Sequence, residues 1–187
     1  MEHTITENLP LFPLGIIVLP GETRFLHIFE QRYKNLFEDL DKHDNRFGIP
    51  YITAGKLTGT GSYVKLEKVL AKYSNGEADI AVKGLDIFKV YNYRDEHPER
   101  AYPYGDIELL NKSSVRATNT LIEAFEKYNT HVLKLDLDNF AGAGFYVIAN
   151  SIGLSDLEKY DLLTRGSEQA LNKTLVNHLN LRTLLAL

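Results

Sequence analysis

Apolar and polar residues alternate with a period of two through the first part of the chain, which is typical of β-strands. In ADIAVKG (residues 78–84), apolar residues alternate with Asp, Ala and Lys, as expected for a strand that buries one face. Directly before it, Asn75-Gly76 favours a type I′ hairpin turn, because both residues tolerate a positive φ. The pattern therefore predicts a β-hairpin that joins residues 62–73 to residues 77–93.

The predicted strands are short and bent. In residues 62–73 the apolar positions change face near Glu67 and Lys68, which indicates a β-bulge. Further corners are expected at the glycines Gly55, Gly59, Gly61, Gly84 and Gly105. Repeated bends in antiparallel strands predict a small barrel rather than a flat sheet, and the chain reversal at Pro20-Gly21 is expected to close it.

One helix interrupts the strand pattern. Residues 29–42 are predicted to be helical, because five apolar residues follow the spacing i, i+4, i+7, i+8, i+11. These residues are Phe29, Tyr33, Leu36, Phe37 and Leu40. We expect the helix to pack on the barrel through this stripe.

After about residue 113 the apolar period becomes that of helices. The first stripe consists of Leu121, Ile122, Phe125, Tyr128 and Val132. A second helix is expected over residues 140–152, and Ser155 with Glu158 forms a capping box that starts a third. A last helix is expected close to the C-terminus.

Taken together, the patterns predict an α+β fold in two subdomains. Residues 1–112 are expected to form an antiparallel β-barrel with one inserted helix, and residues 113–187 a helical subdomain of about four helices. The chain has 187 residues, of which 44% are hydrophobic, and this is enough to bury cores of that size.

Composition excludes several classes of protein. The chain has no cysteine, which rules out a disulfide-stapled secreted scaffold and favours a cytoplasmic location. Its net charge of −4 does not favour general binding to nucleic acid. We also expect no membrane association, because no run approaches the roughly 18 apolar residues that a membrane span requires.

The sequence carries no recognisable catalytic motif. The six histidines show no HExxH spacing, so we predict no metal site. GxSxG is absent, and the AGAG cluster at residues 141–144 lacks the Lys and Ser/Thr that a phosphate loop needs. We therefore predict that the chain is not an enzyme and binds no cofactor.

Tyrosines are the strongest candidates for binding. Tyr91 and Tyr93 are expected to share one strand face, and Tyr102 and Tyr104 to share a face with polar residues. Four tyrosines on an outer surface would suit a protein or peptide contact, because each ring is large and its hydroxyl is polar. The alternative is that these tyrosines are half-buried at the barrel rim or against the helices.

Arg32, next to Tyr33, is a further candidate binding residue. Its guanidinium could form a bidentate pair with a carboxylate of a partner. The alternative is that Arg32 forms an ion pair with Glu30 or holds a strand end in place.

Two stretches resemble a known family. LPLFPLGIIVLPGE followed by FLHIFEQRYKNLFEDL resembles the start of the N-terminal substrate-binding domain of the Lon protease family (peptidase S16), in its stand-alone form. TGTGSYVKLEKVLAKYSNGEADIAVKGLDIFKV is similar to the second block of that family, and the helical end is similar to its helical part. The resemblance implies a PUA-like barrel with a helical subdomain, in a region that helps Lon to engage unfolded substrates. The ATPase and protease motifs of Lon are not found in this sequence.

We therefore expect a non-catalytic, proteolysis-associated module that binds unfolded or apolar polypeptide, or a protease or chaperone partner. The alternative is an RNA-binding module of the PUA-like type. It would use a basic face formed by Lys56, Lys65, Lys68, Lys72, Lys83 and Lys89. Steep weakening of binding by salt would favour that alternative.

Overall fold

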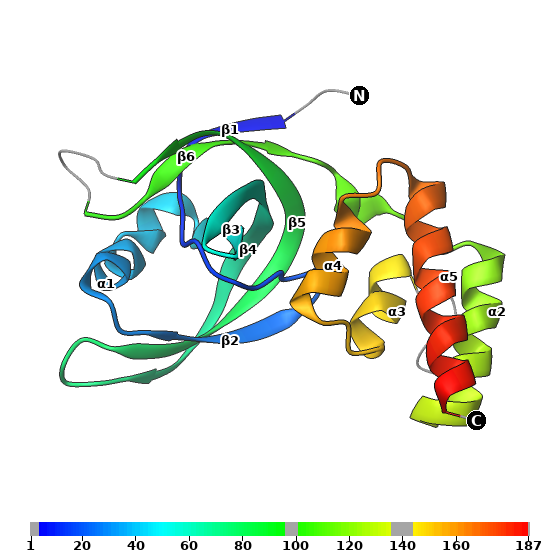
Figure 1. The fold of residues 1–187 in the computed structure, drawn as a ribbon. Helices are drawn as coiled ribbons and strands as arrows, with labels where there is room; N and C mark the ends of the chain where they lie inside the picture. The colour runs from blue at the N-terminus through cyan, green and yellow to red at the C-terminus, as the bar shows by residue number, and fades with distance from the viewer. Residues whose placement is uncertain (1–3, 96–100, 136–143, 187) are drawn as a thin grey trace. The chain divides into compact units, whose positions relative to one another are not determined.

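The computed structural model describes residues 4–95, 101–135 and 144–186 (Figure 1). The chain divides into two compact units, Met1–Ser113 and Ser114–Leu187. The first unit contains all six strands of the described residues, and the second is built from helices. The fold is therefore of mixed α+β type with an antiparallel sheet, as the sequence predicts.

The sheet of the first unit is dominated by two long strands, β4 (Lys56–Lys72) and β5 (Ala78–Arg94), which pair from Thr60 opposite Lys89 to Lys72 opposite Ala78. The order is β1-β6-β5-β4-β3, with β1 (Thr4–Pro10), β6 (Tyr104–Leu109) and β3 (Arg46–Thr53). All of these pairs are antiparallel. Strand β2 (Thr23–Ile28) pairs with the first part of β5.

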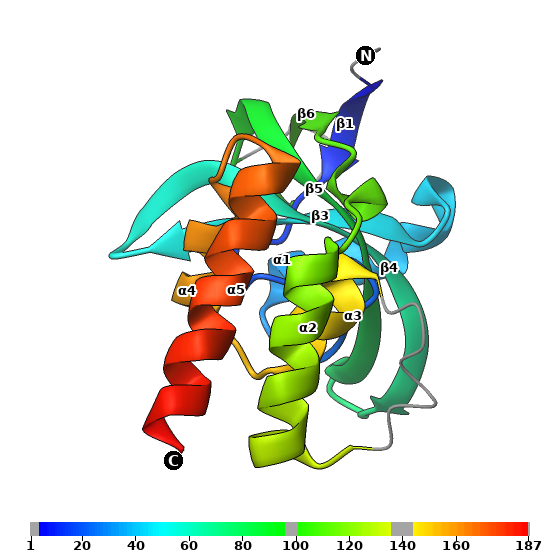
Figure 2. The same ribbon diagram turned by 90° about the vertical axis from the view of Figure 1, so that its right-hand side faces the viewer.

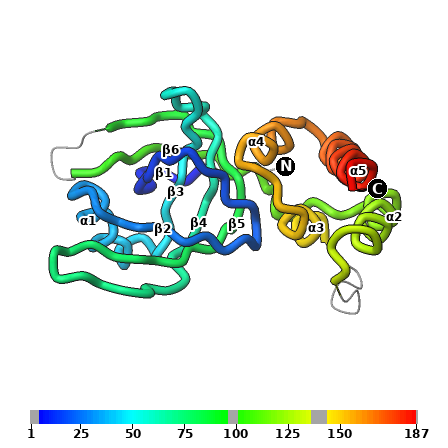
Figure 3. The backbone as a smooth tube through the Cα atoms, turned by 60° about the horizontal axis from the view of Figure 1, so that its bottom comes forward, coloured from blue at the N-terminus to red at the C-terminus, as the bar shows by residue number. Residues whose placement is uncertain are grey.

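The hairpin between β4 and β5 confirms the prediction around Asn75-Gly76, but not the turn type (Figure 3). The N–H of Gly76 donates to the carbonyl of Tyr73 at 3.0 Å, and the N–H of Tyr73 donates to Glu77 at 2.9 Å. Gly76 has φ +82°, whereas Asn75 has no positive φ. This is a three-residue loop with a left-handed glycine rather than the type I′ turn. The predicted bulge is confirmed by a register shift between Leu66 and Lys68.

The predicted closed barrel is not confirmed, because no strand ladder joins β1 to β3 among the described residues. Isolated parallel bridges at Leu11–Gly48 and Leu14–Tyr51 connect the segment after β1 to β3. Pro10 and Pro13 have no N–H, so this segment cannot form a continuous ladder. Its bonds to β3 include Phe12 N to Gly48 O at 2.8 Å and Ile52 N to Leu14 O at 2.9 Å.

Two clusters form the core of the first unit. The larger one contains Phe47, Ile80 and Val82 from the sheet, with Tyr33 and Leu36 from helix α1 (Gln31–Glu38). The smaller one surrounds Phe88. Gly48 and Gly61 make room for this ring, because a Cβ would approach it to 2.9 Å and 2.5 Å.

Helix α1 is shorter than the predicted helix over residues 29–42. It begins at Gln31, and it is followed by a 3₁₀ helix, η1 (Leu40–His43), while a second short 3₁₀ turn, η2 (Lys112–Ser114), follows β6. Phe29 was predicted to lie in the helical stripe, and this is wrong. The extended chain of β2 continues through Glu30, which has φ −69° and ψ 139°, and leaves Phe29 exposed.

The second unit contains α2 (Asn119–Tyr128), α3 (Phe145–Ser151), α4 (Asp156–Leu163) and α5 (Glu168–Leu185). A π-helical turn, η3 (Asn129–Leu133), extends α2. Helices α2 and α5 pack side by side (Figure 2). Residues 140–143 of the predicted second helix lie outside the described residues, and the remainder of that helix begins at Phe145.

The helix starts follow the predicted capping chemistry. Ser155 and Glu158 form a complete capping box at the start of α4, and the Ser167 hydroxyl accepts from Ala170 N at the start of α5. The predicted stripe of α2 is buried at Leu121, Phe125 and Tyr128. Each signal is local in sequence, so each could be found without knowing the tertiary fold.

Candidate functional site

The predicted outer surface of four tyrosines does not form. Tyr102 is 1% exposed in the larger core cluster, and Tyr104 is also buried, so the surface placement is wrong for these two residues. Tyr102 precedes β6, where strand alternation does not apply. Its hydroxyl donates to Asp39 Oδ2 at 3.0 Å, at the C-terminal end of α1. Hydrogen bonds from Lys42 and then Tyr102 hold the pKa of Asp39 below its usual range.

Tyr91 and Tyr93 lie on β5, as predicted, but in different surroundings. Tyr91 is exposed, and its hydroxyl donates to the buried Glu108. Tyr93 is partly buried against the smaller core cluster, and its hydroxyl donates to Asp95 Oδ1 at 3.0 Å. Burial raises the pKa of Tyr93 above its ordinary value, so it remains a neutral donor. A binding role for these two residues stays a prediction.

Arg32 and Tyr33 lie near Tyr93, so the structure brings together three of the six predicted residues. The Arg32 guanidinium lies 4.7 Å from the centroid of the Tyr33 ring. Its Nε donates to Glu30 Oε2 at 3.2 Å, and its Nη1 lies 3.8 Å from Asp95. Arg32 therefore makes the internal ion pair that the sequence left open as the alternative to a clamp for a partner's carboxylate.

A group of exposed aromatic residues was missed by the sequence reading. Phe25 and His27 project from the outer face of β2, Phe29 follows in the same register, and Tyr73 follows β4. We call Phe25, His27, Phe29 and Tyr73 the aromatic face. Phe25 is 72% exposed, Phe29 57% and Tyr73 47%. Large apolar side chains gathered at this exposure are a recognised mark of an interaction surface.

His27 connects the members of the aromatic face. Its ring stacks on Phe29 with centroids 5.9 Å apart and meets Tyr73 edge-on at 6.2 Å. Its Nδ1 lies 2.7 Å from Asp79 Oδ1, and its Nε2 lies 3.4 Å from Glu77. The Tyr73 hydroxyl also donates to Asp79, at 2.6 Å. This bond and then the one from His27 lower the pKa of Asp79, so His27 and Tyr73 contact a carboxylate that stays ionised.

The signal for the aromatic face was present in the sequence. In residues 23–29, Phe25, His27 and Phe29 occupy every second position, while Leu26 and Ile28 alternate with them. Phe29 also fits the helical spacing of residues 29–40, so the sequence alone assigns it to the helix. In the structure, β2 pairs with β5 from Thr23 to Ile28 and buries Ile28, so Phe29 follows the strand pattern.

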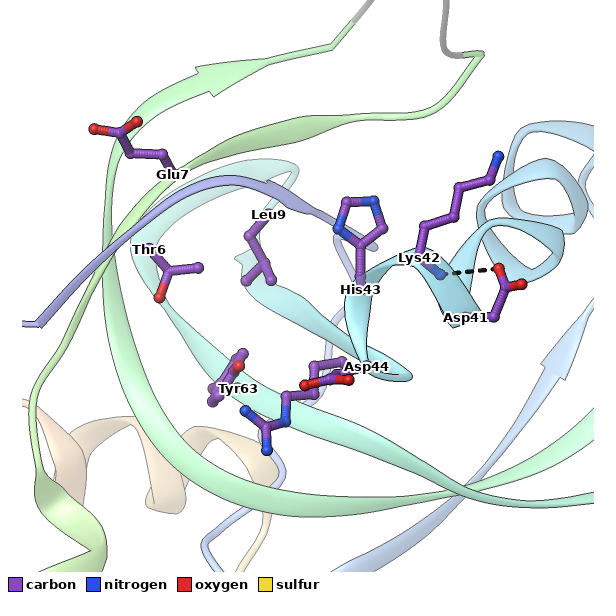
Figure 4. Close-up of a pocket in the computed structure, with 9 residues that line it drawn as sticks. Thr6, Glu7, Leu9, Asp41, Lys42, His43, Asp44 and Tyr63 are labelled. Carbon is purple, nitrogen blue, oxygen red and sulfur yellow. Dashed lines mark hydrogen bonds between the residues drawn. The ribbon is translucent and has the colours of Figure 1, made fainter.

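A polar pocket of about 290 Å³ lies elsewhere in the first unit (Figure 4). It is lined by Thr6, Glu7, Leu9, Asp41, Lys42, His43, Asp44, Arg46 and Tyr63. These residues come from β1, from η1 and the turn after it, and from β3 and β4. Within the described parts of the chain, no group of three or more His, Cys, Asp or Glu residues could hold a metal ion. No helix in those parts is long and apolar enough to cross a membrane.

Comparisons with known proteins agree with this architecture. Residues 8–180 match the profile of a family described as ATP-dependent protease La (LON) substrate-binding domain. The structure is similar to a Lon N-terminal domain protein from Xanthomonas campestris, with a TM-score of 0.68 and 24% identity over 92% of this chain and 97% of that chain. It is also similar to the N-terminal domain of the Mycobacterium avium complex Lon protease, with a TM-score of 0.62 and 15% identity over 93% and 98%. At these identities the structural likeness shows the fold alone. No curated protein sequence matches the chain.

Proposed function

Because the chain belongs to the family of the ATP-dependent protease La (LON) substrate-binding domain, we propose that it is a non-catalytic module that binds unfolded, apolar segments of polypeptide. Family membership supports the general role of substrate recognition. The finer proposal, that the ligand is an unfolded apolar segment, is supported chiefly by the aromatic face. Phe25 and Phe29 are largely exposed, although Phe29 stacks on His27, and their rings would be buried by an apolar partner.

The edge of the sheet favours an extended ligand. In the described part of the chain β2 pairs only with β5, so no strand pairs with its other edge. An extended polypeptide can add to such an edge through its backbone, while alternate side chains contact the residues that project from the strand. Backbone bonding is independent of ligand sequence, which suits a module that accepts many unfolded segments.

The acidic residues within the aromatic face add a preference. Asp79 and Glu77 lie beside His27, and the Asp79 carboxylate stays ionised. A basic residue flanking the apolar segment would therefore be favoured over an acidic one. Since the rings provide most of the contact area, binding should change little with added salt.

The test measures binding of an unstructured ten-residue peptide that contains spaced leucine and phenylalanine residues, with a control peptide in which serine replaces them. We expect micromolar affinity for the apolar peptide and none for the control. Phe25→Ser combined with Phe29→Ser should weaken binding about tenfold or more, because truncation of buried aromatic contacts at interfaces has effects of this size. Leu157→Ser removes a similarly exposed apolar residue from the second unit and serves as the matched control.

The same measurement locates the binding surface. Tyr91→Ala tests the site predicted from sequence on β5, where the tyrosine is also exposed. If Tyr91→Ala weakens binding and the Phe25 and Phe29 variant does not, the ligand lies on β5 rather than on the aromatic face. If neither peptide binds at millimolar concentration, the proposal of apolar polypeptide recognition is wrong.

The RNA-binding alternative gains no support from the family match or from the similar structures. It remains distinguishable by experiment, because counterion release makes RNA binding fall steeply with salt.

A further inference from the structure

The pocket shown in Figure 4 contains a cation without a partner. The Nε atom of Arg46 is buried and makes no hydrogen bond. Among the residues that the structure describes, the whole Arg46 side chain forms no hydrogen bond, ion pair or aromatic contact. A guanidinium has five N–H donors, and buried polar groups in proteins are nearly always paired. The buried Nε–H of Arg46 thus lacks an acceptor that a ligand could provide.

The residue opposite Arg46 in the sheet is a second cation. In the register of β3 and β4, Arg46 lies directly opposite Lys65. Like charges at directly opposite positions destabilise a strand pair. Lys65 also has no ion-pair partner in the described part of the chain. Two adjacent unpaired cations favour an anion at this edge of the pocket.

The backbone around the pocket is held in uncommon conformations. Asp44 and Asn45, directly before Arg46, have φ values of 55° and 57°, and Asn8 in β1 has φ 53°. Left-handed backbone is uncommon at residues other than glycine, although Asn and Asp adopt it more readily than the rest. Asn8 N donates to Asp106 Oδ1 at 3.0 Å, and Asn45 N donates to Leu40 O at 2.8 Å, so both walls are fixed by internal bonds. The pocket is therefore preorganised.

From these observations we infer that the pocket binds a carboxylate group, with Arg46 as its principal partner. The planar fork of a guanidinium matches the two oxygens of a carboxylate. Glu7, Asp41 and Asp44 also line the pocket, and their repulsion disfavours a dianion such as phosphate more than a monoanion. In Figure 4, Leu9 lies toward the middle of the pocket, whereas Glu7 and Lys42 point outward. Leu9 provides an apolar contact for the carbon atoms next to the carboxylate.

The carboxylate can come from a small acid or from a peptide, and the test separates these sources. N-acetyl-leucine carries a carboxylate beside one apolar side chain, and N-acetyl-leucinamide is its uncharged match. Both are titrated into ¹⁵N-labelled protein, and the amide signals of Thr6, Asp44 and Tyr63 are followed. We expect saturable shifts with N-acetyl-leucine and none with the amide. A hexapeptide with a free C-terminus, compared with its C-terminal amide, then shows whether a peptide carboxylate also enters.

Substitution of Arg46 tests most directly whether this side chain binds the carboxylate. Arg46→Gln should weaken N-acetyl-leucine binding about tenfold or more, the usual effect of losing a hydrogen-bonded charge, and Arg46→Lys should restore part of it. Lys68→Gln removes an exposed cation of β4 that does not line the pocket, and it should leave binding unchanged. Because the Arg46 side chain makes no internal bond, Arg46→Gln should not lower the unfolding temperature of the ligand-free protein.

Three outcomes would overturn the inference: equal binding of acid and amide, unchanged affinity in Arg46→Gln, or a fall of several degrees in the unfolding temperature of the ligand-free Arg46→Gln variant. The last would mean that Arg46 supports the fold. The inference does not rest on the aromatic face. An amidated apolar peptide has no free carboxylate, so its binding to the Arg46→Gln protein tests the aromatic face alone. Apolar peptide binding and carboxylate binding can therefore be confirmed or rejected separately.

Discussion

The two units of the chain differ in how completely their polar and aromatic side chains are used within the unit itself. In the second unit, polar side chains bond within the unit: Asn172 joins the start of α2 to the start of α5, and Arg182 donates to the Glu158 carboxylate of α4. In the first unit, Phe25 and Phe29 are exposed and Arg46 has no partner. Both units expose apolar side chains, such as Leu184 in the second, so the difference lies in the exposed aromatic rings and the buried Nε of Arg46, which the first unit leaves for a ligand to contact.

The largest expected difference is between Asn172→Ala and Phe25→Ser. The Asn172 side chain is buried, its Oδ1 accepts from Thr118 N at 2.8 Å, and its Nδ2 donates to Arg116 O and Glu168 O at 3.0 and 2.9 Å. Alanine would remove the side-chain partners of Thr118 N and Arg116 O, which should lower the free energy of unfolding by about 3 kcal/mol. Phe25→Ser should change it by less than about 0.5 kcal/mol, because the ring is exposed.

Chemical denaturation of both variants measures this contrast directly. Peptide binding should show the opposite pattern. Asn172→Ala should bind the peptide normally at temperatures where it is folded, whereas loss of the exposed rings should weaken binding. Equal destabilisation by the two substitutions would break the comparison, since it would give the aromatic face a structural role.

Much of the fold could be predicted from sequence where the cause is local. The capping box at Ser155 and the hairpin at Gly76 depend on residues within a few positions of each other, and both are present. Closure of a barrel depends on whether the segment after Pro10 pairs continuously with β3, and these parts are distant in sequence. Proline chemistry explains the interrupted pairing once the partners are known, but it does not identify the partners.

The candidate sites were harder to predict than the fold for a related reason. Phe29 fits both a strand period and a helix period, and the choice depends on pairing between β2 and β5. Tyr102 could be assigned to a surface by strand alternation, but it precedes β6 and enters the core. Arg46 gives no sequence signal at all, because its significance lies in the absence of an acceptor among the described residues around it.

A second, smaller contrast concerns pH. Burial alone would raise the pKa of Glu158, but hydrogen bonds from the backbone and hydroxyl of Ser155 and from Arg182 lower it to about 2. A lowered carboxyl pKa contributes stability above the ordinary value of 4.5, and this contribution is lost as the pH falls from 4.5 towards 2. Since about a third of the side chain is exposed, we expect a contribution of only about 1–2 kcal/mol.

The measurement is the free energy of unfolding between pH 7 and pH 2, in the original protein and in Glu158→Gln. The variant should be less stable at pH 7 and should lose less stability on acidification. Asp79→Asn beside the aromatic face is the matched control: the pKa of Asp79 is also lowered, by Tyr73 and then His27, but no arginine contributes. A steeper pH response from Asp79 than from Glu158 would reverse the assignment of roles to the two units.

The smallest expected effect is a gain in stability from relief of backbone strain. Lys134 ends η3 with φ 56°, and its N–H donates to Asn129 O at 2.7 Å, a position where glycine is favoured. Lys134→Gly should therefore raise the free energy of unfolding by about 0.5–1 kcal/mol. Asp44→Gly, at φ 55° in the wall of the Arg46 pocket, should gain less, because aspartate adopts the left-handed region more readily than lysine. A larger gain at Asp44 would contradict this order. It would mean that the backbone is more strained in the pocket wall than at the end of η3, and that the first unit is less stable than it could be because of its pocket.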